Sequence, residues 1–158
     1  MTSDTLAAEI RAACIRQLSR REYGRAELAQ RLRAKGFPAG SVEPVLTELV
    51  REGLIDDRRF ASMVVRRRAE QGFGRSRVVA ELRQLGVASD AMADTDVDWD
   101  AVLQRLYRKR YGTREPLSDR DRTARWRYLS QRGFSTDQIR RVLRAHEHPE
   151  TISEFATS

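Results

Sequence analysis

At Gly53-Leu54-Ile55-Asp56-Asp57-Arg58-Arg59-Phe60-Ala61 the sequence passes from one amphipathic helix to the next. Before this stretch, which we call the joint, apolar residues recur at helical spacing from Val42 to Leu49, and they resume after it from Phe60 to Val65. Gly53 is a natural helix stop, and Asp56 or Asp57 can cap the helix that follows. We expect Leu54, Ile55 and Phe60 to be buried, so the joint has a mainly structural role.

The helical pattern around the joint recurs along the chain. The recurring markers are an aromatic–glycine pair before a middle helix and a glycine–apolar pair after it: Tyr23-Gly24 and Gly36-Phe37, Phe73-Gly74 and Gly86-Val87, Tyr111-Gly112 and Gly133-Phe134. The apolar positions Leu32, Leu82 and Leu129 occupy the same place in the three copies. Self-similarity at such a period is the signature of a repeat architecture.

These copies predict an all-α fold, a tandem array of three three-helix repeats forming an elongated, curved, monomeric molecule. The first repeat is expected at residues 4–55 and the second at 56–96, with a short third helix from about 89 to 93. The third is expected at 97–148, with an insertion near 113–121, and residues 149–158 are expected to form a flexible tail.

Local signals predict several helix ends. Gly36, Gly86 and Gly133 should each end a middle helix, with a positive φ at the glycine. Ser41 is the expected N-cap of the third helix. Ser118 with Asp121, and Ser135 with Gln138, have the spacing of capping boxes.

The joint, the repeated helical triplets and Lys35-Gly36-Phe37 together resemble the RecX family, regulators of the bacterial RecA recombinase. The resemblance covers roughly residues 7–144, and the joint is its most specific part. It implies a curved array of three-helix repeats that binds along the groove of the RecA filament on single-stranded DNA. It also implies suppression of ATP turnover, of strand exchange and of the filament's co-protease role.

Charge is distributed unevenly along the 158 residues. Of the 30 basic residues 28 are arginines, which suits a polyanionic or acidic partner or simply reflects codon bias. Residues 57–88 carry a net charge of +5 and residues 101–148 of +8, whereas residues 89–100 carry −5. Two basic segments flanking an acidic one favour an electrostatic footprint on a polyanion or an acidic groove wall.

Residue types also argue against several functional classes. The single Cys14 excludes a disulfide framework, and His146-Glu147-His148 places its two histidines on different sides of a helix, so no metal site is expected. No phosphate-binding glycine loop or catalytic constellation is present, so we expect no enzymatic activity and no cofactor. Without a long apolar run or a signal peptide, a soluble cytoplasmic protein with no membrane partner is expected.

Exposed basic side chains are the candidate contacts with a filament or with DNA. In the expected helices they lie opposite apolar positions, and a solvated helix face is the simpler interpretation for any single one of them. As a group they favour a binding surface. The candidates are Arg59, Arg66, Arg67, Arg75, Arg108, Lys109, Arg140, Arg141 and Arg144.

Three other interpretations stay open. A helix-turn-helix regulator would use residues 41–52 as its recognition helix, but that helix carries Glu43, Glu48 and Glu52. A binder of single-stranded or double-stranded DNA fits the net charge of +7, although its aromatic residues at Tyr23, Phe73, Tyr111 and Phe134 are expected in the core. A scaffold that holds helical partners is the third.

Overall fold

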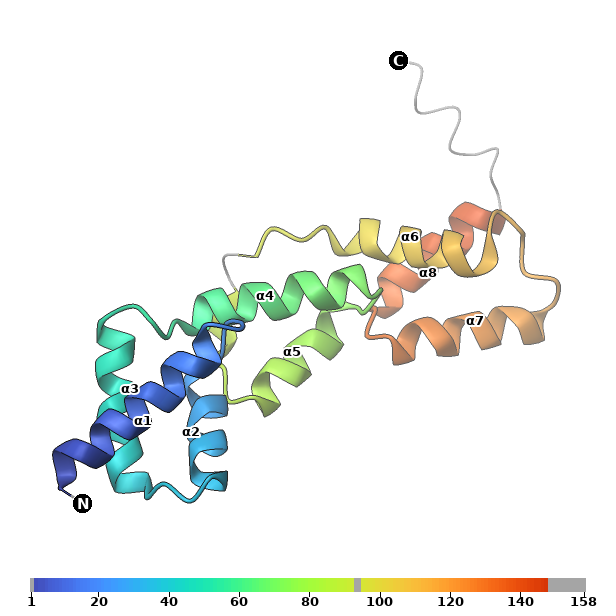
Figure 1. The fold of residues 1–158 in the computed structure, drawn as a ribbon. Coiled ribbons are helices and arrows are strands. Elements are labelled where there is room, and N and C mark those ends of the chain that lie inside the picture. The colour runs from blue at the N-terminus through green and yellow to red at the C-terminus, as the bar shows by residue number, and fades with distance from the viewer. Residues whose placement is uncertain (1, 93–94, 148–158) are drawn as a thin grey trace, which may run out of the picture. The chain divides into compact units, whose positions relative to one another are not determined.

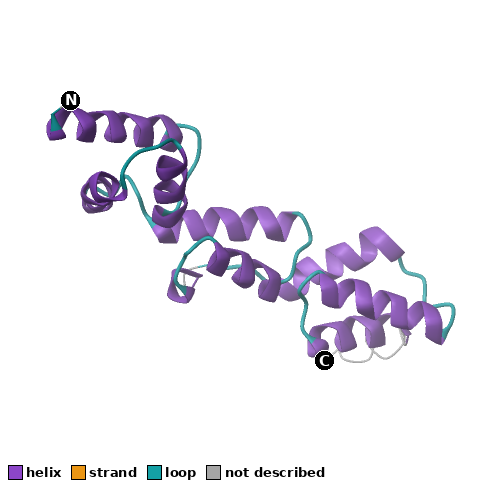
Figure 2. Cartoon of the chain, turned by 90° about the horizontal axis from the view of Figure 1, so that it is seen from below, coloured by secondary structure: helices purple, strands orange, loops and turns teal. Residues whose placement is uncertain are grey.

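The computed structural model describes residues 2–92 and 95–147, and helices are the regular secondary structure throughout them (Figure 1, Figure 2). The elements are α1 (Ser3–Leu18), α2 (Arg25–Ala34), α3 (Ala39–Arg51), α4 (Asp57–Glu70), α5 (Arg75–Gln84), the 3₁₀ helix η1 (Ser89–Met92), α6 (Trp99–Tyr111), α7 (Asp119–Gln131) and α8 (Thr136–Glu147). The all-α prediction is confirmed. Among these helices none has the length and apolar character that crossing a bilayer requires.

The chain divides into two compact units, and the first comprises residues 1–65 and 81–95. Its core is mainly aliphatic and joins α1, α2 and α3, whose ribbons are coloured blue to teal in Figure 1. Ile10, Cys14, Leu28 and Leu46 have no exposed surface. Cys14 is therefore a core residue, and burial raises the pKa of its thiol.

The second compact unit comprises residues 66–80 and 96–158. In its described part the end of α4 and the helices α6, α7 and α8 share one core, which includes Leu103, Tyr107, Leu129 and Leu143. A loop of residues 112–118 connects α6 to α7. This loop contains most of the insertion predicted from the sequence.

Each middle helix ends at a glycine, as predicted. Gly36, Gly86 and Gly133 have φ values of 93°, 74° and 97°. After α2 the N–H of Phe37 donates to the carbonyl of Leu32 at 3.2 Å, and the equivalent bonds follow α5 and α7. Such a 6→1 bond with a left-handed glycine is a Schellman cap, which satisfies carbonyls at the end of the helix.

One local prediction in the first unit is wrong. α3 begins at Ala39, not after Ser41, because the carbonyl of Pro38 accepts the N–H groups of Ser41 and Val42 and so starts the helix earlier. On α1, Ile15 is apolar, yet 39% of its surface is exposed. α1 buries Ile10, Ala13 and Cys14, and this stripe leaves Ile15 at its edge.

Candidate interaction surface

The joint fastens two helices with its two aspartates. The Asp56 carboxylate accepts the backbone N–H groups of Arg58 at 2.9 Å and Arg59 at 3.1 Å, so it caps α4. The Asp57 carboxylate reaches outside its own helix and accepts the N–H of Arg25, the first residue of α2, at 2.9 Å. The N-cap of α2 is Gly24, which has no side-chain oxygen to accept a hydrogen bond. The Asp57 carboxylate of α4 supplies the missing acceptor.

Side-chain burial in the joint differs from the prediction at one residue. Ile55 and Phe60 are buried as expected, with 2% and 1% of their surfaces exposed, but Leu54 is 39% exposed. The N–H groups of Leu54 and Ile55 both donate to the carbonyl of Leu49, and this tight turn buries the second side chain only. A Cβ built at Gly24 would lie 2.9 Å from a ring carbon of Phe60, so glycine is needed for this approach.

Arg59 has internal partners. Its guanidinium donates to the Glu22 carboxylate at 2.9 Å and to the carbonyl of Gly53 at 2.8 Å, and it lies 3.6 Å from Asp56. These contacts connect the end of the α1–α2 loop to the joint. The side chain is nevertheless half exposed, so its role in contacting a partner stays a prediction.

Six of the nine candidate cations carry no hydrogen bond or ion pair to any residue that the structure describes. All six are exposed and all belong to the second compact unit: Arg66, Arg67, Arg75, Arg108, Lys109 and Arg144. In the first unit several arginines form short ion pairs, such as Arg11 with Glu52 at 2.7 Å and Arg21 with Glu27 at 2.7 Å. Arg16, Arg20 and Arg83 of that unit have no such partner among the described residues. The candidate cations without a partner nevertheless all lie in the second unit.

The last two candidates, Arg140 and Arg141 on α8, are exposed but form ion pairs. Ile139, Val142 and Leu143 are buried, so the predicted division of α8 into a core face and an arginine face is correct. Arg140 lies 3.6 Å from Asp137. Arg141 donates to both carboxylate oxygens of Asp100 at 3.1 Å.

Asp100 connects α6 to α8. The Gln138 amide also donates to its carboxylate, at 2.8 Å. The hydrogen bonds from Gln138 and Arg141 lower the pKa of the Asp100 carboxyl. The acidic segment therefore supplies a structural partner to α8, a function that its charge alone did not reveal.

A buried arginine holds the insertion against the third repeat. Arg125, with 5% of its surface exposed, donates to the hydroxyl of Tyr107 at 2.8 Å and to the carbonyls of Arg114 at 3.0 Å and Glu115 at 3.3 Å. It also forms an ion pair with Asp121 at 2.9 Å. Burial opposes the charged form, but the bonds to Tyr107 and Asp121 outweigh it and raise the pKa of Arg125.

Sequence reasoning missed Arg125, although the repeats contain the signal. Its equivalents four residues before the shared leucine are Leu28 and Val78, both with no exposed surface. Of the two predicted capping boxes one is complete, because Ser135 and Gln138 cap each other at 3.0 and 3.2 Å. The other is half formed. The Ser118 hydroxyl accepts the N–H of Asp121 at 3.1 Å, but the Asp121 carboxylate accepts the N–H of Leu117 rather than that of Ser118.

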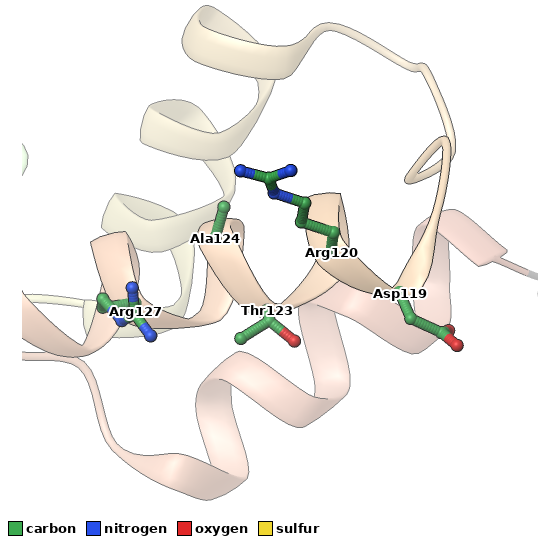
Figure 3. A pocket seen from close by; sticks show the side chains of 5 residues that line it. All are labelled: Asp119, Arg120, Thr123, Ala124 and Arg127. Atoms are coloured by element: carbon green, nitrogen blue, oxygen red, sulfur yellow. The ribbon is translucent and has the colours of Figure 1, made fainter.

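A hollow of about 560 Å³ lies along the outer side of α7 (Figure 3). Its lining residues all come from that helix: Asp119, Arg120, Thr123, Ala124 and Arg127. Arg120 and Arg127 are exposed, and neither pairs with another described residue. Their separation by seven positions, two helical turns, is the signal that could have identified them as one surface.

The rival DNA-binding interpretations meet specific obstacles. On α3, the expected recognition helix, Glu43 forms an ion pair with Arg25 at 3.1 Å. A winged helix-turn-helix protein has a β-hairpin after its recognition helix, whereas here the joint leads into the helix α4. The Tyr23 ring is 5% exposed and has the Arg21 guanidinium 3.6 Å above it. Phe73 likewise has Arg132 at 3.9 Å. These ring faces are already stacked on arginines.

The first two residues of the histidine motif at the end of α8 have partners within the third repeat. His146 stacks on Tyr107 with ring centroids 4.5 Å apart, and Glu147 pairs with Arg122 at 3.1 Å, so both residues are held against the rest of the third repeat. His148 lies outside the described residues. Within the described ranges no three histidine, cysteine or carboxylate side chains are grouped to hold a metal ion.

Three family models match consecutive parts of the chain: RecX, first three-helix domain, at residues 11–49; RecX, second three-helix domain, at 56–95; and RecX, third three-helix domain, at 96–143. The tandem-repeat prediction is thereby confirmed. The regulatory protein RecX of Halorhodospira halophila is 42% identical over 135 residues, which are 83% of this chain and 84% of that protein. That of Ectopseudomonas mendocina is 37% identical, over 85% of this chain and 93% of its own.

Solved structures show the same fold. A crystal structure of RecX from Lactobacillus salivarius matches with a TM-score of 0.74 at 19% identity, covering 91% of this chain and 98% of its own. A second crystal structure, of a regulatory protein RecX, matches with a TM-score of 0.72 at 22% identity, over 90% and 73% of the two chains.

Proposed function

This chain belongs to the RecX family of regulatory proteins, and from that premise we propose that it is a non-catalytic modulator of the RecA recombinase. It binds the filament that RecA forms on single-stranded DNA, in the cytoplasm, and inhibits recombination, ATP hydrolysis and co-protease activity. The observation that supports this proposal is the set of six exposed, unpaired cations in the second compact unit. Carboxylates or phosphates of a partner could neutralise these cations without breaking any ion pair that the structure shows within the chain.

The proposed mechanism is occupancy. Guanidinium groups bind carboxylates and phosphates through two parallel N–H bonds, so an arginine-rich surface can contact both the protein wall and the DNA of a nucleoprotein filament. A chain held there excludes the strand partner or the protein substrate. The first unit, where several arginines are already paired internally, then contributes the fold and the apolar packing rather than the main electrostatic attraction.

Charge reversal separates the unpaired cations from the paired ones. We expect Arg66→Glu with Arg67→Glu, and separately Arg144→Glu, to weaken inhibition of RecA ATPase activity on single-stranded DNA. Arg51→Glu is the matched control, because Arg51 is exposed but already paired with Glu48 on α3. The inhibition by the parent chain should fall as salt is added, because salt screens such contacts and reduces the entropy gained when binding releases counterions.

Cosedimentation distinguishes a filament reader from a plain DNA binder. We expect the chain to sediment with RecA on single-stranded DNA at concentrations where it leaves the same DNA without RecA in the supernatant. If the variants lose binding to bare DNA and filament inhibition in parallel, the chain is a DNA binder instead. If they inhibit as well as the parent at equal salt, these six cations are only a solvated surface.

A further inference from the structure

Both compact units contain the same junction between two successive middle helices. In the first unit a Cβ built at Gly86, after α5, would lie 2.7 Å from the Cβ of Ala26 on α2. In the second unit a Cβ built at Gly133, after α7, would lie 2.6 Å from the Cβ of Arg77 on α5. In both, the glycine turn that ends one middle helix packs on the first turn of the middle helix of the preceding repeat.

The second of these junctions is also bonded through its backbone. The N–H of Gly74 donates to the carbonyl of Arg132 at 2.7 Å, and the Ser76 hydroxyl donates to that of Gly133 at 2.6 Å. The Arg77 guanidinium donates to the carbonyl of Gln131 at 3.1 Å. The receiving helix therefore supplies N–H and guanidinium donors to the free carbonyls at the end of the incoming helix.

Register identifies the corresponding receiving positions on α7. Ala26 is six residues before the shared leucine of its repeat, and Arg77 is five residues before its own. Counted back from Leu129, these positions are Thr123 and Ala124. Both line the hollow on the outer side of α7, where their small side chains leave the helix surface accessible (Figure 3).

One glycine turn of this kind packs on no other described helix. Gly36 ends α2 with a φ of 93°, in the same conformation as Gly86 and Gly133, but no heavy atom lies within 4 Å of a Cβ built there. Among the described residues, the chain thus has one receiving surface and one glycine turn that no internal junction uses.

We propose that these two surfaces bind each other between copies of this chain, the Gly36 turn of one copy seating in the α7 hollow of the next. The end of α2 carries the negative end of its dipole, and Arg120 and Arg127 are the unpaired donors on the hollow. Lys35 beside Gly36 is opposite in charge to Asp119 on the hollow's rim. The contact is heterologous, so each copy can bind one neighbour through its Gly36 turn and another through its α7 hollow.

The contact is weaker than the internal junctions. In the same register Asp121 of α7 corresponds to Gly74, which precedes α5, and the backbone N–H of Asp121 already donates to the Ser118 hydroxyl at 3.1 Å. The backbone bond that Gly74 makes therefore has no counterpart. A small surface of this kind gives a transient association, consistent with a chain that is monomeric when dilute.

Sedimentation velocity of the full chain tests the proposal with two blocked variants. Ala124→Trp fills the hollow and leaves the Gly36 turn intact. Gly36→Asn adds a side chain to the turn and leaves the hollow intact, and asparagine tolerates a positive φ. Ala101→Trp on α6 and Gly40→Ala on α3 are the matched controls, because both residues are exposed and a Cβ at Gly40 meets nothing. Circular dichroism establishes that each variant is folded.

The parent and both controls should increase in average mass as concentration rises toward ~1 mM, the range of weak complexes. Each blocked variant alone should stay monomeric, whereas an equimolar mixture of the two should form a dimer and nothing larger. Lys35→Glu and Asp119→Lys should likewise associate better mixed than apart, which tests the pairing without added bulk. A parent that stays monomeric, a mixture that stays monomeric, or a blocked variant that associates like the parent would overturn the proposal.

Discussion

Replacing Gly133 and Gly36 separately by alanine should separate two reasons for having glycine at the end of a middle helix. Both residues have nearly the same backbone conformation, with φ values of 97° and 93°. A Cβ at Gly36 meets nothing within 4 Å, but one at Gly133 would lie 2.7 Å from the backbone nitrogen of Arg77. Gly36→Ala therefore tests backbone strain alone, and Gly133→Ala tests strain together with a steric clash.

The expected magnitudes follow from these two terms. An L-residue in the left-handed region costs about 1–2 kcal/mol, and this cost applies to both variants. Forcing extra atoms into a packed site costs roughly a further 1–3 kcal/mol, and only Gly133→Ala incurs it, because the obstacle is backbone that cannot rotate away. Gly86→Ala should fall between them, since its Cβ would meet only the Ala26 side chain at 2.7 Å.

Urea denaturation followed by circular dichroism measures the three variants against the parent. Equal m-values would allow the midpoints to be compared directly as free energies of unfolding. Equal losses for Gly36→Ala and Gly133→Ala would refute the close approach of α7 to α5. A loss near zero for Gly36→Ala would refute its left-handed conformation.

Two further predictions concern stability. Asp57→Ala should lower the free energy of unfolding by about 1 kcal/mol, because it removes the cap that α4 supplies to α2; an unchanged urea midpoint would mean that water replaces this oxygen without loss. Burial and the nearby charges of Arg108 and Arg125 lower the pKa of His146 from 6.5. Below pH 6.5 the unfolded chain therefore takes up a proton that the folded chain resists, so stability should fall as the pH is lowered through this value. His146→Gln should abolish that component, whereas the lowered pKa values of Asp100 and Asp121 act only below about 4.

Local rules recovered most of the fold because each helix end is determined by neighbouring residues. Glycines with positive φ, capping boxes and apolar spacing act within a few positions, so Gly86 and Ser135 could be assigned from the sequence. The α3 boundary was missed because proline at an N-cap offers only its carbonyl, and Ser41 looked like the stronger signal. Leu54 was assigned to the core because spacing alone cannot tell which of two adjacent apolar residues a turn buries.

The candidate surface was less accessible from sequence, because pairing is a property of tertiary structure. Exposure of Arg66 and Arg144 followed from helical periodicity, but the internal partners of Arg59 and Arg141 come from residues 37 and 41 positions away. No local pattern identifies such partners. Helical spacing could place Arg120 and Arg127 on one face of α7, but the use of that face as a receiving surface follows only from the junctions that the structure shows.

Arg125 has a consequence for how this chain can change. It occupies a position that is aliphatic in the other two repeats, and its hydrogen bonds to the insertion compensate for burying its charge. Deleting the insertion alone would leave a guanidinium in the core without those carbonyls, and replacing the arginine alone would release the loop. Either single change would give a destabilised chain. We therefore expect Arg125 and the insertion to be gained or lost together. Transplanting one repeat onto another scaffold would succeed only if both travel with it.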